Sequence, residues 1–316
     1  MSDESFTIRV GSYNLFEGGL GSLDDPGGHR NQDDPDFSRL REQVALLKRL
    51  DLDLLGLQEA TWGPHSRSLA DFVADELDMP WRFVGPSNFY GCDLAAFVKV
   101  SDHLDYENVT HLTGPPFVHG LTNVKLRIEG FSVPAHFLVG HSAPSSPGTR
   151  LLEAEMVTVH SGQPVIYVAD FNAAATDDDP DTTGLPPYKT SKKLIKAPAQ
   201  ELAAAGFHDI GHLCRDRTPT VGHLEDKLAY RADRICATLP PALITDYGVV
   251  DTGDHLSDHR IVWAELTFAA APHPGQLAST TLALPAPRQP AQPLTPSARC
   301  RPRPRRPLLR PEGRAL

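Results

Sequence analysis

Cysteine is scarce in this chain and never occurs in close pairs. The 316 residues contain four cysteines, at positions 92, 214, 236 and 300. The absence of a CxxC pair excludes the spacing of zinc ribbons and thioredoxin-like redox motifs. Scattered thiols are typical of a reducing compartment, so we expect free cysteines and a cytoplasmic location.

Long apolar runs are also absent. No stretch reaches the roughly 18 apolar residues of a transmembrane helix, which predicts no membrane association. The first ten residues, MSDESFTIRV, lack the basic start and apolar run of a secretory signal. With 40% apolar and 22% charged residues the composition is that of a globular protein, and we expect a monomer.

Excess positive charge is missing from most of the chain. The net charge is −10, while residues 271–316 contain eight arginines and one acid and so carry +7; residues 1–270 therefore carry −17. A body this acidic is poorly suited to sequence-independent capture of nucleic acid phosphates. Nucleic acid remains an open partner that the charge does not favour.

Proline density separates the C-terminal segment from the rest. Residues 271–316 hold 11 of the 29 prolines, including the run RCRPRPRRP at 299–307. Proline at this density disfavours helices and central strands, and few apolar residues remain to be buried. We predict a folded domain over residues 1–270 and a disordered Pro/Arg-rich tail over residues 271–316. The tail is interpreted as a solvated extension, with binding of a polyanion or a partner as the alternative.

Strand and helix patterns alternate through the folded part. Alternating or continuous apolar runs predict strands, and apolar residues at helical spacing predict amphipathic helices. The predicted strands are 6–14, 52–59, 81–84, 93–99, 122–129, 132–141, 164–170, 232–237, 243–249 and 260–268, and the predicted helices are 37–50, 66–77, 149–160 and 191–205. This order favours an α/β body of packed sheets covered by helices. The long connections 17–36, 172–190 and 208–231 are expected to shape a substrate site.

Polar side chains recur where the predicted strands begin or end. Because polar groups at neighbouring strand ends converge on one rim, where ligands commonly bind, these side chains form one candidate site. They are Asn14, Glu59, His141, Asp170, Asn172, Asp233, Asp258 and His259.

Each of these positions also has a structural interpretation. Asn14 suits a turn and Glu59 suits the first turn of a helix. Asp170-Phe171-Asn172 suits an Asx turn, and Ser257-Asp258-His259 a polar turn before a strand. Asp233, between two arginines, could form a surface ion pair. The order in which these residues occur along the chain favours a functional site over the structural interpretations.

In that order the segments resemble the motifs of the endonuclease/exonuclease/phosphatase superfamily, which has the exonuclease-III-like and pancreatic-deoxyribonuclease-like fold. The matching segments are Tyr13-Asn14, Gln58-Glu59, His141 ending a strand, Asp170-Phe171-Asn172, Asp233 between arginines, and Ser257-Asp258-His259. The resemblance spans about residues 5–268. It implies a four-layer sandwich of two packed mixed β-sheets flanked by helices. Ala169 replaces the glycine of the usual GDxN motif, and Arg234 replaces a more frequent tyrosine.

The resemblance also implies a metal site and a set of catalytic roles. Glu59 would bind Mg²⁺ or Mn²⁺, and Asn14 and Asp258 would add oxygen ligands directly or through water. Asp170 would orient or deprotonate the attacking water, or protonate the leaving oxygen. Asn172 would hold the water or a phosphate oxygen.

Three further residues complete this implied set. His259 would contact the phosphate as a general acid/base or as a hydrogen-bond donor. Asp233 would support His259 by accepting its other ring N–H. His141 would donate to a non-bridging oxygen. Two other polar features are interpreted as solvated: the side chain of Arg150 and the acidic loop at 177–181.

These expectations combine into a divalent-metal-dependent hydrolase of phosphoester bonds. The acidic body favours a small phosphodiester or phosphomonoester as substrate. A DNA or RNA nuclease of the same superfamily is the close alternative. A catalytically inactive binding module is an alternative of another class, but it predicts missing acids, and none of the motif positions is missing.

Overall fold

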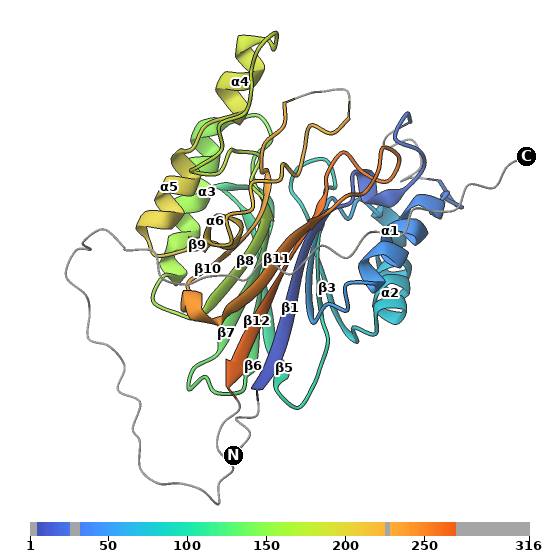
Figure 1. Ribbon diagram of the computed structural model, residues 1–316. Helices are drawn as coiled ribbons and strands as arrows, with labels where there is room; N and C mark the ends of the chain where they lie inside the picture. The colour runs from blue at the N-terminus through green and yellow to red at the C-terminus, as the bar shows by residue number, and fades with distance from the viewer. Residues whose placement is uncertain (1–4, 26–31, 225–227, 270–316) are drawn as a thin grey trace, which may run out of the picture.

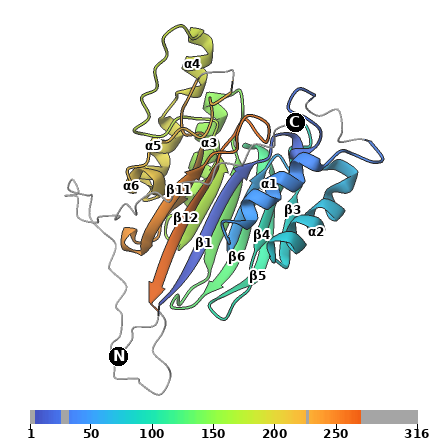
Figure 2. The same cartoon turned by 45° about the vertical axis from the view of Figure 1, so that its right-hand side comes forward.

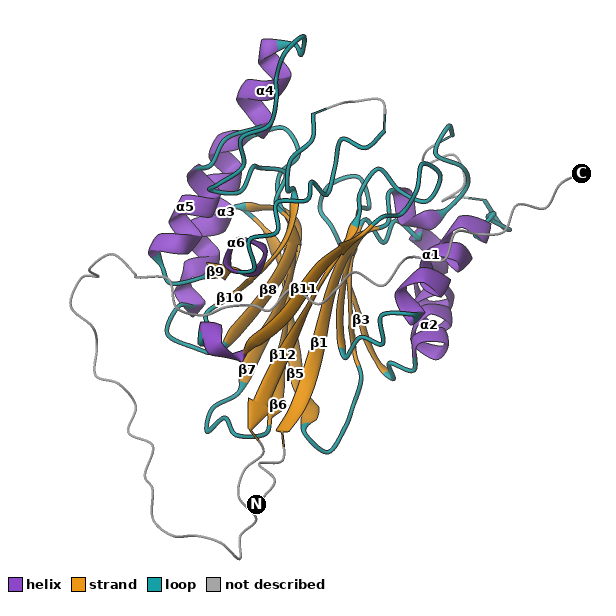
Figure 3. Cartoon of the chain, in the orientation of Figure 1, coloured by secondary structure: helices purple, strands orange, loops and turns teal. Residues whose placement is uncertain are grey.

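Two six-stranded β-sheets pack against each other between layers of helices (Figures 1 and 3). The structure, a computed structural model, describes residues 5–25, 32–224 and 228–269. The predicted tail at 271–316 lies outside the described residues. The prediction of an α/β sandwich of two packed, mixed sheets flanked by helices is confirmed.

The first sheet has the strand order β11-β12-β1-β2-β4-β3. Its strands are β1 (Ser5–Asn14), β2 (Leu54–Gln58), β3 (Trp81–Gly85), β4 (Leu94–Val98), β11 (Ile244–Val250) and β12 (Ile261–Ala269). Strands β1 and β2 are parallel and the other neighbours are antiparallel.

The second sheet has the order β5-β6-β7-β8-β10-β9. Its strands are β5 (Leu104–Gly114), β6 (Phe117–Ile128), β7 (Ala135–His141), β8 (Val165–Asp170), β9 (His208–Asp209) and β10 (Asp233–Ala237). Here only β7 and β8 are parallel.

Helices cover the outer face of each sheet. The α-helices are α1 (Ser38–Lys48), α2 (Ser66–Leu77), α3 (Pro147–Val157), α4 (Pro187–Lys193), α5 (Ala197–Ala204) and α6 (Ile210–Leu213), and the short 3-10 helices are Glu17–Gly19, Gly63–His65, Thr158–His160 and Pro241–Leu243. Helices α1 and α2 pack on the first sheet, and α3 and α5 pack on the second (Figure 2). Helix α4 has no buried side chain and projects from the body (Figure 1).

The main core lies between the two sheets and takes apolar side chains from both. The sheets approach each other closely at Gly56 on β2. A Cβ atom added there would lie 2.4 Å from Cγ2 of Val168 on β8. The two sheets are therefore held in close contact near the strand ends that carry the polar residues.

Some predicted elements differ from the structure. The single helix predicted over 191–205 is two helices, α4 and α5, because Pro198 sits in the first turn of α5 and starts a new helix there. Strand β5 was not predicted, since most of its residues are at least partly exposed and few are apolar. The connections 172–190 and 208–231 are partly structured by α4, β9 and α6.

Candidate active site

Strand register brings the polar strand ends to one rim. Asn14 pairs with Gln58 across β1 and β2, and His141 pairs with Asp170 across β7 and β8. Asp233 begins the antiparallel β10 opposite Asp170. The segment before β12 reaches the same rim because β12 runs antiparallel to β1, and Ser257 Oγ donates to the Asn14 carbonyl at 2.8 Å.

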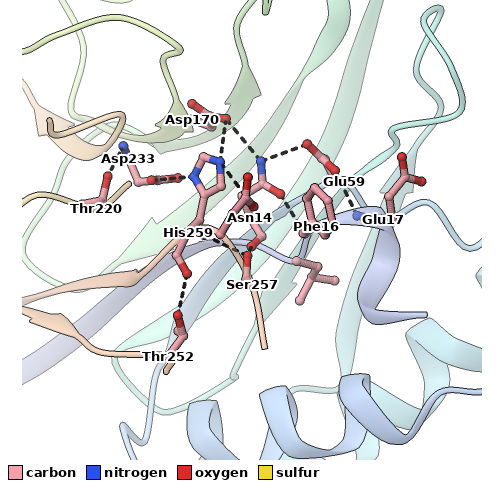
Figure 4. A network of polar contacts seen from close by, with 12 residues as sticks. Asn14, Phe16, Glu17, Glu59, Asp170, Thr220, Asp233, Thr252, Ser257 and His259 are labelled. Atoms are coloured by element: carbon pink, nitrogen blue, oxygen red, sulfur yellow. Dashed lines mark hydrogen bonds and ion pairs between the residues drawn. The ribbon is translucent and has the colours of Figure 1, made fainter. Parts of the chain in front are cut away.

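Several polar side chains of the site share Asp170 as a partner, and Figure 4 shows its contacts with Asn14 and His259. Its buried Oδ2 accepts hydrogen bonds from Nδ2 of Asn14 and of Asn172, both at 3.2 Å. The same oxygen lies 3.3 Å from His141 Nε2 and 3.8 Å from His259 Nε2. Its other oxygen accepts the backbone N–H of Asn172 at 2.8 Å.

This surrounding keeps Asp170 ionised. Burial alone would raise the pKa of the Asp170 carboxyl. The charge of His259 and the hydrogen bond and charge of His141 outweigh burial and hold that pKa well below its ordinary value. Asp170 is thus a carboxylate at neutral pH, fixed in orientation by donors on several sides.

His259 and Asp233 form a buried pair beside it. His259 Nδ1 lies 2.8 Å from Asp233 Oδ2, which leaves Nε2 facing Asp170. Burial opposes protonation of His259, but the charges of Asp233, Asp258 and Asp170 raise its pKa well above the ordinary value. Burial raises the pKa of Asp233, and the imidazolium beside it opposes that shift. The geometry is that of an imidazolium oriented by a carboxylate.

His141 is stacked on a second histidine that sequence patterns did not single out. The rings of His119 and His141 are 4.0 Å apart and nearly parallel. Burial and the charge of His141 lower the pKa of His119 to about 2, so the His119 ring is neutral. Burial opposes protonation of His141, but Asp170 outweighs it and raises its pKa. His141 can therefore act as a charged hydrogen-bond donor, and its ring is held in place by stacking on the neutral ring of His119.

Asn172 links the Asp170 carboxylate to a lysine. Its Nδ2 donates to Asp170 Oδ2 and to the Ser142 carbonyl at 3.1 Å. Its Oδ1 accepts a hydrogen bond from Lys193 Nζ at the end of α4. Lys193 was not among the predicted site residues, because only the path of the chain after Asn172 returns it to the rim.

Asn14 and Glu59 join the site to the first sheet. Asn14 Nδ2 bridges Glu59 Oε1 and Asp170 Oδ2, at 3.2 Å each. Its Oδ1 accepts the Phe16 N–H at 2.9 Å, which leaves one oxygen lone pair for a ligand. Glu59 Oε2 also accepts the backbone N–H of Glu17 at 3.0 Å.

Asp258 lies near the Glu59 and Asp170 carboxylates, and it has little hydrogen bonding to offset their negative charge. Its Oδ1 is inaccessible and has no hydrogen-bond partner, although it lies 3.9 Å from His259 Nε2. Burial raises the pKa of Asp258 most. The His259 imidazolium opposes this shift, and the charges of Glu59 and Asp170 add to it. Negative charge is therefore concentrated where these carboxylates meet.

This donor set fits a hard divalent cation. Such cations take carboxylate and amide oxygens as ligands, and a bound cation would relieve the mutual repulsion of Glu59 and Asp258. A second group, Asp170, Asp233 and His259, offers ligand atoms within 4.8 Å of one another and could also hold a metal. In that group, however, Nδ1 of His259 is already bonded to Asp233.

Two site residues have unusual backbone conformations. Glu59 has φ 54° and Asn172 has φ 49°, in the left-handed region that non-glycine residues rarely occupy. Asparagine tolerates this region better than glutamate. Strain of this kind persists where surrounding contacts demand it, and both residues aim polar groups at Asp170 or its neighbours.

Two buried arginines hold the rim together, and one corrects a prediction. Arg39 of α1 donates to backbone carbonyls of two segments next to the site, including Leu15 at 2.9 Å and Leu256 at 2.7 Å. The prediction that Arg150 is solvated is wrong, since its side chain is fully buried. Arg150 Nη1 donates to the Ala143 carbonyl at 2.8 Å, because the turn after β7 folds over the start of α3.

The acidic loop at 177–181 was also predicted to be solvated, and this is wrong for its first two residues. Asp177 and Asp178 both form ion pairs with Arg231, whose side chain is 1% exposed. The pairing of Asp233 with Arg231 or Arg234 on the surface is likewise not found: all three are buried and Asp233 bonds to His259. The loop is pinned because a buried guanidinium requires compensating carboxylates.

We predict that Asp233→Asn shifts the alkaline limb of the pH–rate profile to lower pH. His259 titrates above its ordinary range because of nearby carboxylates, so a form that needs the imidazolium persists to higher pH. Removing one carboxylate lowers that pKa, and the protonated form is then lost earlier as pH rises.

The measurement is kcat/KM against pH for both proteins, with the Mg²⁺ concentration for half-maximal activity determined in parallel. A large loss of metal affinity with an unmoved limb would instead place the metal between Asp170, Asp233 and His259. The matched control is Asp246→Asn on the edge strand β11.

Comparison with known proteins agrees with this geometry. The fold and site together define an α/β sandwich with a cluster of acids and histidines where its two sheets meet. A family model described as Endonuclease/Exonuclease/phosphatase family matches residues 11–259. The chain belongs to this family, which is one of phosphoester hydrolases. No curated protein matched the sequence.

Solved structures share the fold at low sequence identity. A family protein from Bacteroides thetaiotaomicron superposes with TM-score 0.57 and 17% identity, over 84% of this chain and 99% of that one. One from Beutenbergia cavernae DSM 12333 gives TM-score 0.57 and 17% identity, over 84% and 73%. D. rerio TDP2 complexed with single strand DNA product gives 0.56 and 16%, over 83% and 99%. Among the described residues, none of the helices combines the length and apolarity that a bilayer crossing requires.

Proposed function

We propose that this protein is a divalent-metal-dependent hydrolase of a small phosphodiester or phosphomonoester. The observation that carries the proposal is the buried Asp170 carboxylate, oriented by Asn14, Asn172 and His141, with the Asp233–His259 pair beside it. This arrangement combines a proton acceptor with two charged donors in a water-poor site.

The residues divide into acceptor and donor roles. Asp170 is ionised and fixed, so it can orient the attacking water and accept its proton. The imidazoliums of His259 and His141 can donate to phosphate oxygens on which charge increases during the reaction. Asp233 is a positioning residue, because its bond to Nδ1 directs Nε2 of His259 toward the reacting group.

Glu59, Asp258 and Asn14 are the residues we propose for Mg²⁺ or Mn²⁺. When bound, such an ion would polarise the phosphate and offset its negative charge. Glu59 and Asp258 supply carboxylates and Asn14 supplies its amide oxygen. The hydrogen bond between His259 Nδ1 and Asp233 Oδ2 supports this choice over the histidine-containing group.

The charge of the chain supports a small substrate over a long polyanion. Residues 1–270 carry −17, which repels nucleic acid at long range. A nuclease is the second candidate, and one observation favours it: a protein of the same fold, D. rerio TDP2, was solved with a single strand DNA product. An inactive binding module is disfavoured because every predicted acid is present at the rim.

The test is hydrolysis of bis(p-nitrophenyl) phosphate, p-nitrophenyl phosphate and plasmid DNA with Mg²⁺, Mn²⁺ or EDTA. We expect turnover of a small ester that EDTA abolishes and added Mg²⁺ restores. Glu59→Gln should raise the Mg²⁺ concentration for half-maximal activity at least about 10-fold. Glu42→Gln, at an exposed position on α1, is the matched control.

Three results would contradict the proposal. Turnover that persists in EDTA would exclude metal dependence. Preference for plasmid DNA over both small esters would favour the nuclease. No turnover of any of the three would favour the binding module.

A further inference from the structure

Lys193 lies at the reacting end of the site although it belongs to none of the strand-end motifs. Its Nζ donates to Asn172 Oδ1, and Nδ2 of the same amide donates to Asp170. One amide therefore separates the ammonium from the carboxylate at the centre of the site. The charge of Lys193 also helps to lower the pKa of Asp170.

Hydrogen bonds and apolar packing hold the backbone in place at Lys193 and at the residues before and after it. The carbonyl of Lys192 accepts a hydrogen bond from the buried Arg150, and the carbonyl of Lys193 accepts the Ala174 N–H at 3.0 Å. Leu194 packs against the apolar cluster that contains Tyr230. The end of α4 is thus fixed to the rim, while the rest of the helix projects outward (Figure 1).

A phosphate group is a complementary ligand for the Lys193 ammonium at this place. The other groups around Asp170 that can donate to an anion are the two imidazoles, because both amide N–H groups of Asn14 and of Asn172 already have acceptors. Lys193 adds a third positive charge on the side of the second sheet, next to the amide of Asn172. Lysine binds phosphate as a compact point charge with three donors.

We propose that Lys193 is a substrate-binding residue whose ammonium contacts a non-bridging oxygen of the substrate phosphate while it orients Asn172. The inference rests on the proposed function, since it places the phosphate at Asp170. It makes the anchored end of α4 part of the specificity of the site.

The test is calorimetric titration of inorganic phosphate into the full chain with Mg²⁺ present. We expect Lys193→Met to weaken phosphate binding about 10- to 100-fold, as for loss of a hydrogen bond to a charged group. Lys193→Arg should retain part of the affinity. Lys192→Met, at the exposed preceding position of the helix, should stay within about twofold of wild type.

The same variants are assayed for kcat and KM, and circular dichroism confirms their fold. Unchanged phosphate affinity in Lys193→Met would overturn the inference even if kcat falls, because Lys193 would then act only on Asn172. A wild-type protein that binds no phosphate would also overturn it. Failure of the proposed function is a separate result: wild type that binds phosphate through Lys193 yet hydrolyses no ester.

Discussion

Asp170→Asn should lower kcat/KM by about 10⁴-fold without unfolding the protein. This is the upper range for loss of a positioned acid–base group. The substitution removes the proton acceptor and also the charge that helps keep His141 and His259 protonated. Both the acceptor and the donors of the site are therefore weakened by one change of nearly identical shape.

The measurement is kcat/KM on the best small ester, with thermal unfolding followed by circular dichroism. Asp179→Asn, in the same connection but exposed, is the control and should keep wild-type activity. Activity within about 10-fold of wild type in Asp170→Asn would remove Asp170 from the chemistry.

Arg231→Met should reduce the free energy of unfolding by about 3–5 kcal/mol, the cost of breaking a buried ion pair by removing one partner. The guanidinium contacts three carboxylates: Asp178 at 2.9 Å, Asp209 at 3.3 Å, and Asp177. Without it, these acids lose their shared cation in a largely dry environment, and the loop after β8 is released.

Urea denaturation provides the measurement, and the chain offers a matched control. Arg217 also pairs with Asp177, at 3.2 Å, but its side chain is 69% exposed. Arg217→Met should cost less than about 1 kcal/mol, because water screens an exposed pair. Equal losses in the two variants would show that burial is not what makes the Arg231 cluster important.

Sequence patterns were enough to predict an α/β body of packed sheets and the convergence of its polar strand ends, while the four-layer sandwich was implied by the family resemblance. Strong apolar runs such as 164–170 define strands, and parallel register then brings residues like His141 and Asp170 together. The roles of individual residues in catalysis and metal binding stay predictions that the experiments above test.

Other contacts could not be predicted from local patterns. The His119–His141 stack joins two strands through side-chain packing, and Lys193 reaches Asn172 only after a connection of about twenty residues turns back. Arg150 is buried because three backbone carbonyls surround its guanidinium, and nothing in a helical pattern distinguishes it from a solvated arginine. Each of these depends on tertiary geometry that periodicity does not contain.

The close approach of the sheets at Gly56 has a consequence for how activity arises. One sheet contributes Asn14 and Glu59, and the other contributes Asp170 and Asp233, so neither sheet carries all the groups that the proposed function requires. Under the proposed function, turnover depends on the contact between the two sheets. A small displacement of one sheet relative to the other would abolish the proposed activity while leaving every strand, helix and side chain intact.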